Sequence, residues 1–299
     1  VKFQTAVPEL VISTFAPKAE YQKATTGEAE SQLEMCKAIH LPLSDYAELK
    51  ALCDEAGIGF MSTPFDLVSV DCLVPLAMDY WKIPSGEITN LPYLLKIGRL
   101  GGRVIMSTGM ATLDEVEAAV RVLESAGTPR GNIWLLHCTT QYPAPLQSVN
   151  LRAMDALASL GCAGVGYSDH TEGIEVALAA AARGAVIIEK HFTLSRSLPG
   201  PDHKASLEPD ELARLVASVR KVEAALGGGV KEVADAERPN IEVARKSIVA
   251  ARAIAEGELF SEDNITVKRP GNGISPMRWF DVLGSRAPRS FEADELISL

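Results

Sequence analysis

Two histidines stand at matching places in the sequence, each at the polar end of an apolar run. His170 lies in Tyr-Ser-Asp-His-Thr, and His191 lies in Glu-Lys-His-Phe-Thr. Two imidazoles on neighbouring strands, with carboxylates and water nearby, suit a borderline divalent cation, which leaves manganese, magnesium, iron and zinc open. We predict that both histidines bind a metal ion, with Asp169 and Glu189 as their hydrogen-bond partners or as acid and base. The alternative is that each histidine is a satisfied polar residue.

Three lysines, Lys2, Lys82 and Lys190, also stand at the ends of apolar runs. Other polar side chains at these run ends, which we count as candidate binding residues, are Gln4, Thr63, Ser85, Ser107, Thr140 and Ser168. A buried ammonium group needs an anion to offset its charge. The cluster therefore predicts a site for a phosphate or a carboxylate, whereas pairing with Glu87 or Glu189 would explain any single lysine.

Seven short β-rich runs, separated by segments of helical periodicity, must position these residues. The runs are Val1–Gln4, Gly59–Phe65, Tyr80–Glu87, Arg103–Gly109, Asn132–Thr139, Ala163–His170 and Val186–Thr193. Such alternation is typical of a parallel sheet covered by helices. Polar residues close nearly every run, which favours a barrel with its active site at the carboxyl rim over a doubly wound sheet, whose site lies at one switch point. We therefore predict an α/β fold of the (β/α)8 barrel type, without its first βα unit.

The clearest helix signal covers Leu113–Ala126. Thr112 and Glu115 have the spacing of a capping box, and Gly127 follows as a stop signal. Four further helix candidates also end at a glycine: Ser44–Gly57, Asn150–Gly161, Gly173–Gly184 and Glu208–Gly227.

The chain divides after a run of three glycines. We predict a barrel domain over 1–228, a linker over 229–245 and a small β-rich domain over 246–299. The last segment contains two short strand patterns, Ser247–Ala251 and Ile265–Lys268, and no long helix. It is near the lower size limit for independent stability, so we expect it to pack against something else.

Composition narrows the classes of partner. Among 299 residues, 29 Lys and Arg face 39 Asp and Glu, which gives a net charge of −10. With no basic run in the sequence, this charge argues against nucleic-acid binding. No apolar stretch reaches the roughly 18 residues that a membrane helix needs. The five cysteines form no Cys-x-x-Cys pair, which argues against a disulfide framework and indicates a reducing, cytoplasmic setting.

Nine separated motifs together resemble the sialic acid synthases over essentially the whole chain. They are Lys-Phe-Gln at 2–4, Ala-Pro-Lys-Ala-Glu-Tyr-Gln at 16–22, Lys-Ile-Pro-Ser-Gly-Glu at 82–87, Ser-Thr-Gly-Met at 107–110, His-Cys-Thr at 137–139, Tyr-Ser-Asp-His-Thr at 167–171, Glu-Lys-His-Phe-Thr at 189–193, Gly-Pro-Asp-His-Lys-Ala-Ser at 200–206 and Lys-Arg-Pro-Gly-Asn-Gly-Ile-Ser at 268–275. The resemblance implies a barrel followed by a C-terminal antifreeze-like (SAF) domain.

The same resemblance implies a role for each matching residue. His170 and His191 would bind Mn²⁺, or else Mg²⁺ or Co²⁺, beside the sugar aldehyde. Phosphoenolpyruvate would be held by Lys2, Thr63, Lys82, Ser85, Tyr142 and Ser168, with Thr140 standing where some members have Asn. Asp202 would lie near the sugar. Arg269 would reach from the SAF domain of one subunit into the barrel of another, in a domain-swapped homodimer.

The implied reaction joins phosphoenolpyruvate to N-acetylmannosamine and water, giving N-acetylneuraminate and phosphate. An alternative acceptor is 2,4-diacetamido-2,4,6-trideoxymannose, which leads to legionaminic acid. More remote alternatives are a non-catalytic sugar- or ice-binding protein and a metal-dependent aldolase that does not use phosphoenolpyruvate. Members of the family carry another strand and helix, with a substrate-contacting Glu, before Lys-Phe-Gln, so we expect this polypeptide to be weakly active or poorly soluble without them.

Overall fold

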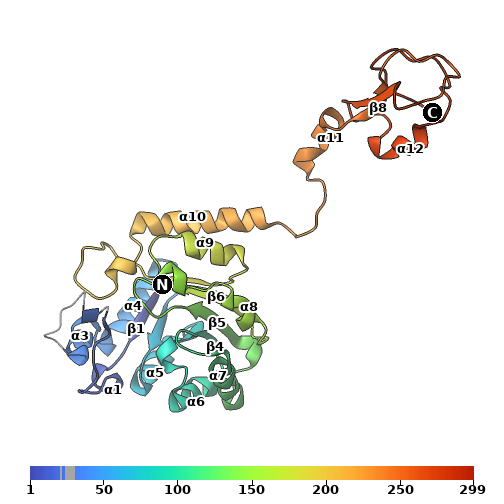
Figure 1. Cartoon of the computed structure of the whole chain (residues 1–299). Helices are drawn as coiled ribbons and strands as arrows, with labels where there is room; N and C mark the ends of the chain where they lie inside the picture. The colour runs from blue at the N-terminus through green and yellow to red at the C-terminus, as the bar shows by residue number, and fades with distance from the viewer. Residues whose placement is uncertain (21, 24–30) are drawn as a thin grey trace. The chain divides into compact units, whose positions relative to one another are not determined.

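The computed structural model describes residues 1–20, 22–23 and 31–299, so Tyr21 of the motif at 16–22 lies outside the described residues. The chain folds into two compact units, Val1–Gly227 and Gly228–Leu299 (Figure 1). Each unit has a hydrophobic core of its own.

In the described residues, seven parallel strands form the frame of the first unit, one in each predicted run. They are β1 (Lys2–Thr5), β2 (Met61–Pro64), β3 (Tyr80–Ile83), β4 (Arg103–Ser107), β5 (Ile133–Cys138), β6 (Gly164–Asp169) and β7 (Ile188–Lys190). β1 pairs with β2, and β3 to β7 form a five-stranded sheet in sequence order. Every strand pair in this unit is parallel, which confirms the predicted α/β architecture. The carboxyl ends of the strands therefore share one rim.

Helices connect these strands and lie around the sheet (Figure 1). Their bounds are α1 (Pro8–Val11), α3 (Gln32–Ile39), α4 (Tyr46–Glu55), α5 (Leu67–Leu73), α6 (Leu91–Arg99), α7 (Leu113–Ala126), α8 (Ala153–Ala158), α9 (Glu175–Ala182) and α10 (Pro209–Leu226). The predicted capping box of α7 is present, because the Glu115 amide donates to Thr112 Oγ1 and the Thr112 amide donates to the Glu115 carboxylate. Gly127 ends α7 with φ 132°.

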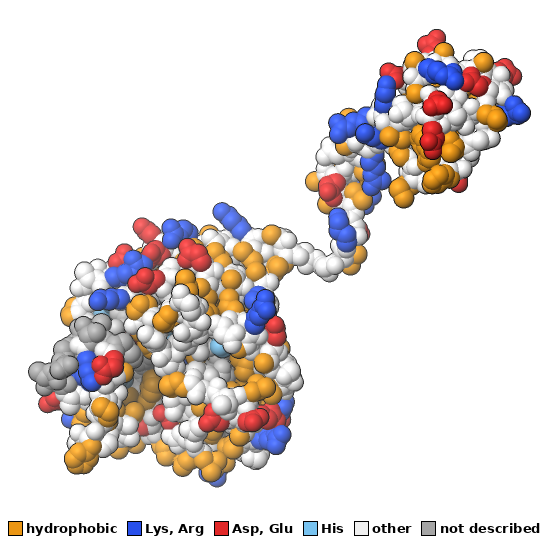
Figure 2. All heavy atoms as spheres, in the orientation of Figure 1, with side chains coloured by type: hydrophobic (Ala, Val, Ile, Leu, Met, Phe, Trp, Pro, Cys, Tyr) orange, Lys and Arg blue, Asp and Glu red, His pale blue; other side chains and the backbone are white. Residues whose placement is uncertain are grey.

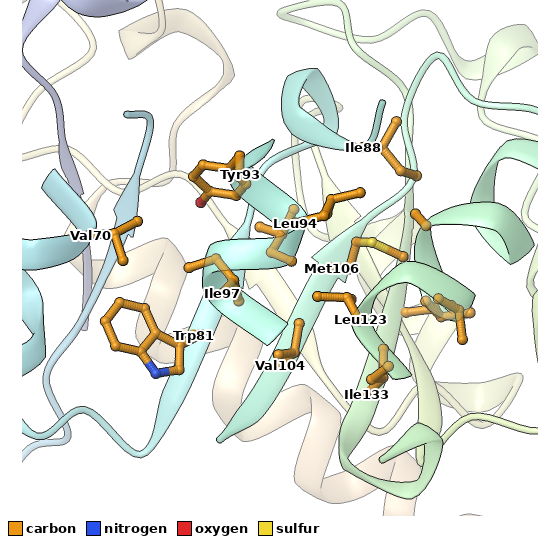
Figure 3. Close-up of a cluster of buried hydrophobic side chains, with 14 of the residues drawn as sticks. Val70, Trp81, Ile88, Tyr93, Leu94, Ile97, Val104, Met106, Leu123 and Ile133 are labelled. Atoms are coloured by element: carbon orange, nitrogen blue, oxygen red, sulfur yellow. The ribbon is translucent and has the colours of Figure 1, made fainter. Parts of the chain in front are cut away.

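The main core of the first unit lies between the sheet and helices α6 and α7. Figure 3 shows Trp81, Val104 and Met106 of the sheet together with Leu94 and Ile97 of α6. Val104, Met106 and Ile97 are fully buried. Burying a large apolar side chain contributes about 1.5–3 kcal/mol, so this core fixes β3 and β4 and the polar residues that they carry to the rim.

The second unit is small and β-rich, as predicted. β8 (Ser247–Ala250) and β9 (Ile265–Lys268) pair in antiparallel register, around a core that includes Ile248, Phe260 and Phe291. This unit also contains α11 (Arg238–Ala244) and α12 (Trp279–Val282). The segment 229–245, predicted to be a linker, thus includes a short helix.

Charges of both signs are mixed on the surface of the first unit. On the face of the first unit shown in Figure 2, Lys and Arg side chains stand beside Asp and Glu, without a broad basic area. Within the described part of the chain, no helix is both long enough and apolar enough to cross a membrane.

Candidate active site

The ends of the strands surround one cavity of about 230 Å³, which we call the strand-end cavity. It is lined by Lys2, Gln4, Thr63, Lys82, Ser85, Ser107, Thr140, Tyr142, Ser168, His170, Glu189 and His191, together with Phe65, Pro84, Gly86, Met110 and Cys138. Every residue of the first group was predicted from the sequence. The strands bring these side chains together because residues two apart on a strand point to the same face.

Two lysines of the strand-end cavity share one carboxylate. The ammonium nitrogens of Lys2 and Lys82 lie 3.5 and 3.7 Å from the same oxygen of Glu189. Lys82 is 2% exposed and donates to Ser107 Oγ at 2.6 Å, and its burial lowers its pKa. Two cations against one anion leave an excess positive charge in a desolvated space, which favours an anionic ligand.

Glu189 is held as a carboxylate. Burial would raise its pKa, but two lysine ammonium groups and a hydroxyl hydrogen bond outweigh that effect and lower the pKa to about 2. The hydroxyl is that of Ser168, which donates to Glu189 Oε1 at 2.8 Å. Glu189 is therefore ionised at neutral pH and a weak proton acceptor.

Two hydroxyls in the cavity have no hydrogen-bond partner within the described protein. They belong to Thr63 and Thr140, and both oxygens are buried. A buried polar group without a partner is costly, so such groups beside excess positive charge indicate a polar ligand. Gly109 makes the close packing here possible, since a Cβ at that position would lie 2.4 Å from the Thr140 hydroxyl.

The two histidines meet at this cavity, with ring centroids 5.4 Å apart. Tyr142 packs on His170 at a centroid distance of 4.2 Å. His170 Nδ1 donates to the carbonyl of Thr139 at 2.7 Å, which leaves Nε2 as the unprotonated nitrogen of the neutral ring. Burial lowers the pKa of His170, and it lowers that of His191 to about 3. Both rings are therefore neutral, the form that binds metals.

This donor set fits a catalytic divalent cation. Among the described residues, no group of three or more His, Cys, Asp or Glu side chains is arranged to hold an ion, so the protein would contribute two imidazoles. A catalytic ion keeps open positions for water and substrate. The neutral, desolvated pair of histidines beside unpartnered hydroxyls meets that requirement.

A second cavity of about 270 Å³ adjoins the first, and we call it the helix-side cavity. The two share Gln4, Phe65, Thr140, Tyr142 and His191. The other lining residues of the helix-side cavity are Ala6, Pro8, Val11, Ile12, Gln22, Gln32, Met35, Cys36, Ile39, His40, Pro201 and Asp202. Most of these are apolar and come from α1, α3 and their flanks, which sequence reasoning did not single out.

Four predicted residues lie outside the strand-end cavity, and one of them is Lys190, which was grouped with Lys2 and Lys82 as a candidate cation for an anionic ligand. Asp202 lines the helix-side cavity, with its carboxylate 3.8 Å from His191 Nδ1, and burial raises its pKa. Asp169 lines neither cavity and pairs instead with Lys190 at 2.9 Å, so it is not placed to act as an acid or base there. Arg269 belongs to the second unit, where its Nε donates to the carbonyl of Ala244 at 3.0 Å.

Family models match both units of the chain. The NeuB family model matches residues 1–231, and the SAF domain model matches residues 245–299. The N,N'-diacetyllegionaminic acid synthase of Campylobacter jejuni is 52% identical over 297 residues, covering 99% of this chain and 89% of that protein. The synthase of the same name from Legionella pneumophila is 43% identical, covering 98% and 83%.

Among solved structures, the N-acetylneuraminic acid (sialic acid) synthetase of Leptospira borgpetersenii serovar Hardjo-bovis superposes with a TM-score of 0.68. It is 34% identical, and the match covers 81% of this chain and 79% of that one. The chain therefore belongs to the NeuB family of sialic acid synthases and carries their SAF domain.

Proposed function

We propose that this enzyme condenses phosphoenolpyruvate with 2,4-diacetamido-2,4,6-trideoxymannose and water, releasing phosphate and N,N'-diacetyllegionaminic acid. The observation that carries the proposal is the pair of adjoining cavities, one cationic and one largely apolar, with His191 in the wall of both. An anionic donor and a sugar acceptor bound side by side would place their reacting carbons at the histidines.

Phosphoenolpyruvate would occupy the strand-end cavity. Lys2 and Lys82 supply positive charge in excess of Glu189, and the Thr63 and Thr140 hydroxyls are available as partners for ligand oxygens. Tyr142, Ser85 and Ser168 complete the lining. Charge-assisted hydrogen bonds of this kind are stronger than neutral ones.

His170 and His191 would hold the metal ion, for which we propose Mn²⁺, with Mg²⁺ or Co²⁺ as substitutes. When bound, such an ion supplies Lewis acidity toward the aldehyde oxygen of the open-chain sugar. The protein groups position the donor, so that its methylene carbon forms the new bond to the aldehyde carbon. Water then bonds to the former enol carbon and gives up its two protons, one to the former aldehyde oxygen and one to the departing phosphate. The bond from that carbon to the phosphate oxygen breaks, its electron pair leaves with the phosphate, and a 2-keto acid remains.

Glu189 is the carboxylate that lines the strand-end cavity in the described residues. Because its pKa is about 2, it would orient the attacking water by accepting a hydrogen bond more effectively than it would remove a proton outright. Asp202, in the helix-side cavity, would hydrogen-bond the sugar.

The helix-side cavity favours the trideoxy acceptor. Val11, Ile12 and Met35 give its wall an apolar character, which suits a methyl group at C6 and a second acetamido methyl. N-acetylmannosamine would place hydroxyls there instead, and each would need a partner. The names of the Campylobacter and Legionella relatives support the same acceptor. N-acetylneuraminate synthesis is the second candidate, supported by the Leptospira relative.

We also propose that two subunits form one complete site, with Arg269 of a second copy contributing a cation toward the acceptor. An Arg269→Ala variant would then lose activity, and mixing it with an inactive His191→Ala variant would restore part of that activity. Persistent full activity of Arg269→Ala would remove this part of the proposal.

The decisive experiment measures phosphate release with each acceptor. We expect release that requires phosphoenolpyruvate, a divalent cation and the sugar together, with a kcat/KM for the trideoxy sugar at least about 10-fold above that for N-acetylmannosamine. The reverse preference would establish the second candidate. Phosphate release without any sugar, or condensation without phosphoenolpyruvate, would contradict both.

A further inference from the structure

Asp169 and Lys190 form a buried ion pair between the last two strands of the sheet. They are register partners on β6 and β7, their side chains are 0% and 3% exposed, and Lys190 Nζ lies 2.9 Å from Asp169 Oδ2. Strand residues alternate between faces, and their neighbours Ser168, His170, Glu189 and His191 all line the strand-end cavity. The pair therefore lies on the opposite face of the sheet, directly behind the two histidines.

Further hydrogen bonds lock this pair. Asp169 Oδ1 accepts from the amide and the hydroxyl of Thr171, at 2.9 and 2.8 Å. Lys190 Nζ also donates to the carbonyl of Thr171. Both carboxylate oxygens of Asp169 are thus used, and the ends of β6 and β7 are joined by directional contacts of their side chains.

This network is in the right place to set strand register. β7 has only three residues, and its ladder partner in the described structure is β6. A slip of one residue would move the whole strand to the other face, turning His191 away from the cavity and Lys190 into it. A buried ion pair contributes little net stability, and fixing register is its best-attested use.

We propose that Asp169 and Lys190 are positioning residues, which fix β7 against β6 and so hold His191 beside His170 for metal binding. The inference rests on the proposed role of the two histidines. It assigns to Asp169 a structural task in place of the acid or base role predicted from sequence.

The test is Mn²⁺ titration of the metal-stripped full chain, followed by calorimetry, with thermal melting of each variant. In Asp169→Asn we expect Mn²⁺ affinity to fall about 10- to 100-fold, the usual effect of losing a group that orients a metal ligand. Asp155→Asn is the control for the loss of a carboxylate from an exposed ion pair. It weakens the 2.6 Å pair with Arg183, which joins α8 to the residue after α9, and should leave Mn²⁺ affinity unchanged.

The double variant Asp169→Leu with Lys190→Met separates positioning from stability. Replacing both charges with apolar groups should keep the melting temperature at or above its normal value, while Mn²⁺ affinity still falls at least about 10-fold. A stable double variant with normal Mn²⁺ affinity would overturn the inference.

If the double variant does not fold, the Thr171→Val variant decides, because it keeps the ion pair and removes one hydrogen bond to Asp169. An Mn²⁺ affinity lowered about threefold supports the inference, and an unchanged Mn²⁺ affinity overturns it.

The same titration separates the inference from the proposed metal site. If the unmodified protein does not bind Mn²⁺, both the metal site and the positioning role are overturned. If it binds Mn²⁺ and the folded variants bind equally well, only the positioning role is overturned.

Discussion

The two cavities at the rim differ in how they are built. The strand-end cavity is made by side chains from parallel strands and is rich in charge, with Lys2, Lys82 and Glu189 in ionic contact. The helix-side cavity is made mainly by α1, α3 and the loops beside them, and most of its wall is apolar. Under the proposed function, side chains of the sheet would carry out the reaction, and the helices at its edge would select the acceptor.

The largest expected loss of turnover comes from substituting His191, which lies in the wall that both cavities share. His191→Ala should lower metal-dependent turnover at least about 1,000-fold while leaving the melting temperature almost unchanged, because the site would lose one of its two imidazole ligands. The control is His137→Gln, since His137 lines neither cavity and its ring contacts the Val149 carbonyl, so turnover should stay within a few-fold of normal. Normal turnover by His191→Ala would mean that the reaction does not depend on this pair.

A nearly equal loss of activity is expected from substituting Lys82, which lines the strand-end cavity alone. Lys82→Met keeps the length of the side chain but removes a buried charge, so kcat/KM for phosphoenolpyruvate should fall about 100- to 1,000-fold. The KM for the sugar should change less than about threefold. Lys96→Met serves as the control, because Lys96 pairs with Asp71 at 2.6 Å and lines neither cavity. If Lys82→Met impaired the kinetic parameters for phosphoenolpyruvate and for the sugar equally, the two substrates would not be bound in separate cavities.

The strand-end cavity could be predicted from sequence and the helix-side cavity could not. Polar residues at the ends of apolar runs are visible in the sequence, and parallel strands must bring such ends to one rim. By contrast, α1 has only four residues, which is too few to show a helical period in the sequence. Its contribution to the wall of the helix-side cavity depends on how it packs in the folded protein. The placement of Asp169 was within reach, because strict alternation along β6 puts it on the face opposite Ser168 and His170.

A smaller effect should follow from changing the helix-side wall. Met35 is 3% exposed, and Met35→Gln would place an amide against the methyl groups of the trideoxy sugar. We expect kcat/KM for that acceptor to fall about 10-fold, with that for N-acetylmannosamine changing far less. Met154→Gln is a matched control of equal burial in α8. Met154→Gln should lower stability without altering the ratio of the two kcat/KM values, one for each acceptor. If it did alter that ratio, the effect of Met35→Gln would come from general destabilisation and not from the wall of the helix-side cavity.

The smallest expected effect separates ligand binding from folding at two neighbouring threonines. Thr63 on β2 has a buried hydroxyl without a protein partner in the described structure, whereas the hydroxyl of Thr5 on β1 lies 2.6 Å from Ser62 Oγ. Thr63→Val should therefore raise the KM for phosphoenolpyruvate about 3- to 10-fold and leave stability unchanged or higher, because a partnerless polar group is removed. Thr5→Val should do the opposite, costing about 1–3 kcal/mol of unfolding free energy by stranding the Ser62 hydroxyl, with the KM for phosphoenolpyruvate almost unchanged. If thermal melts and donor titrations showed both variants losing stability with no change in KM, the Thr63 hydroxyl would belong to the fold and not to the ligand, and the strand-end cavity would lose one of its proposed contacts.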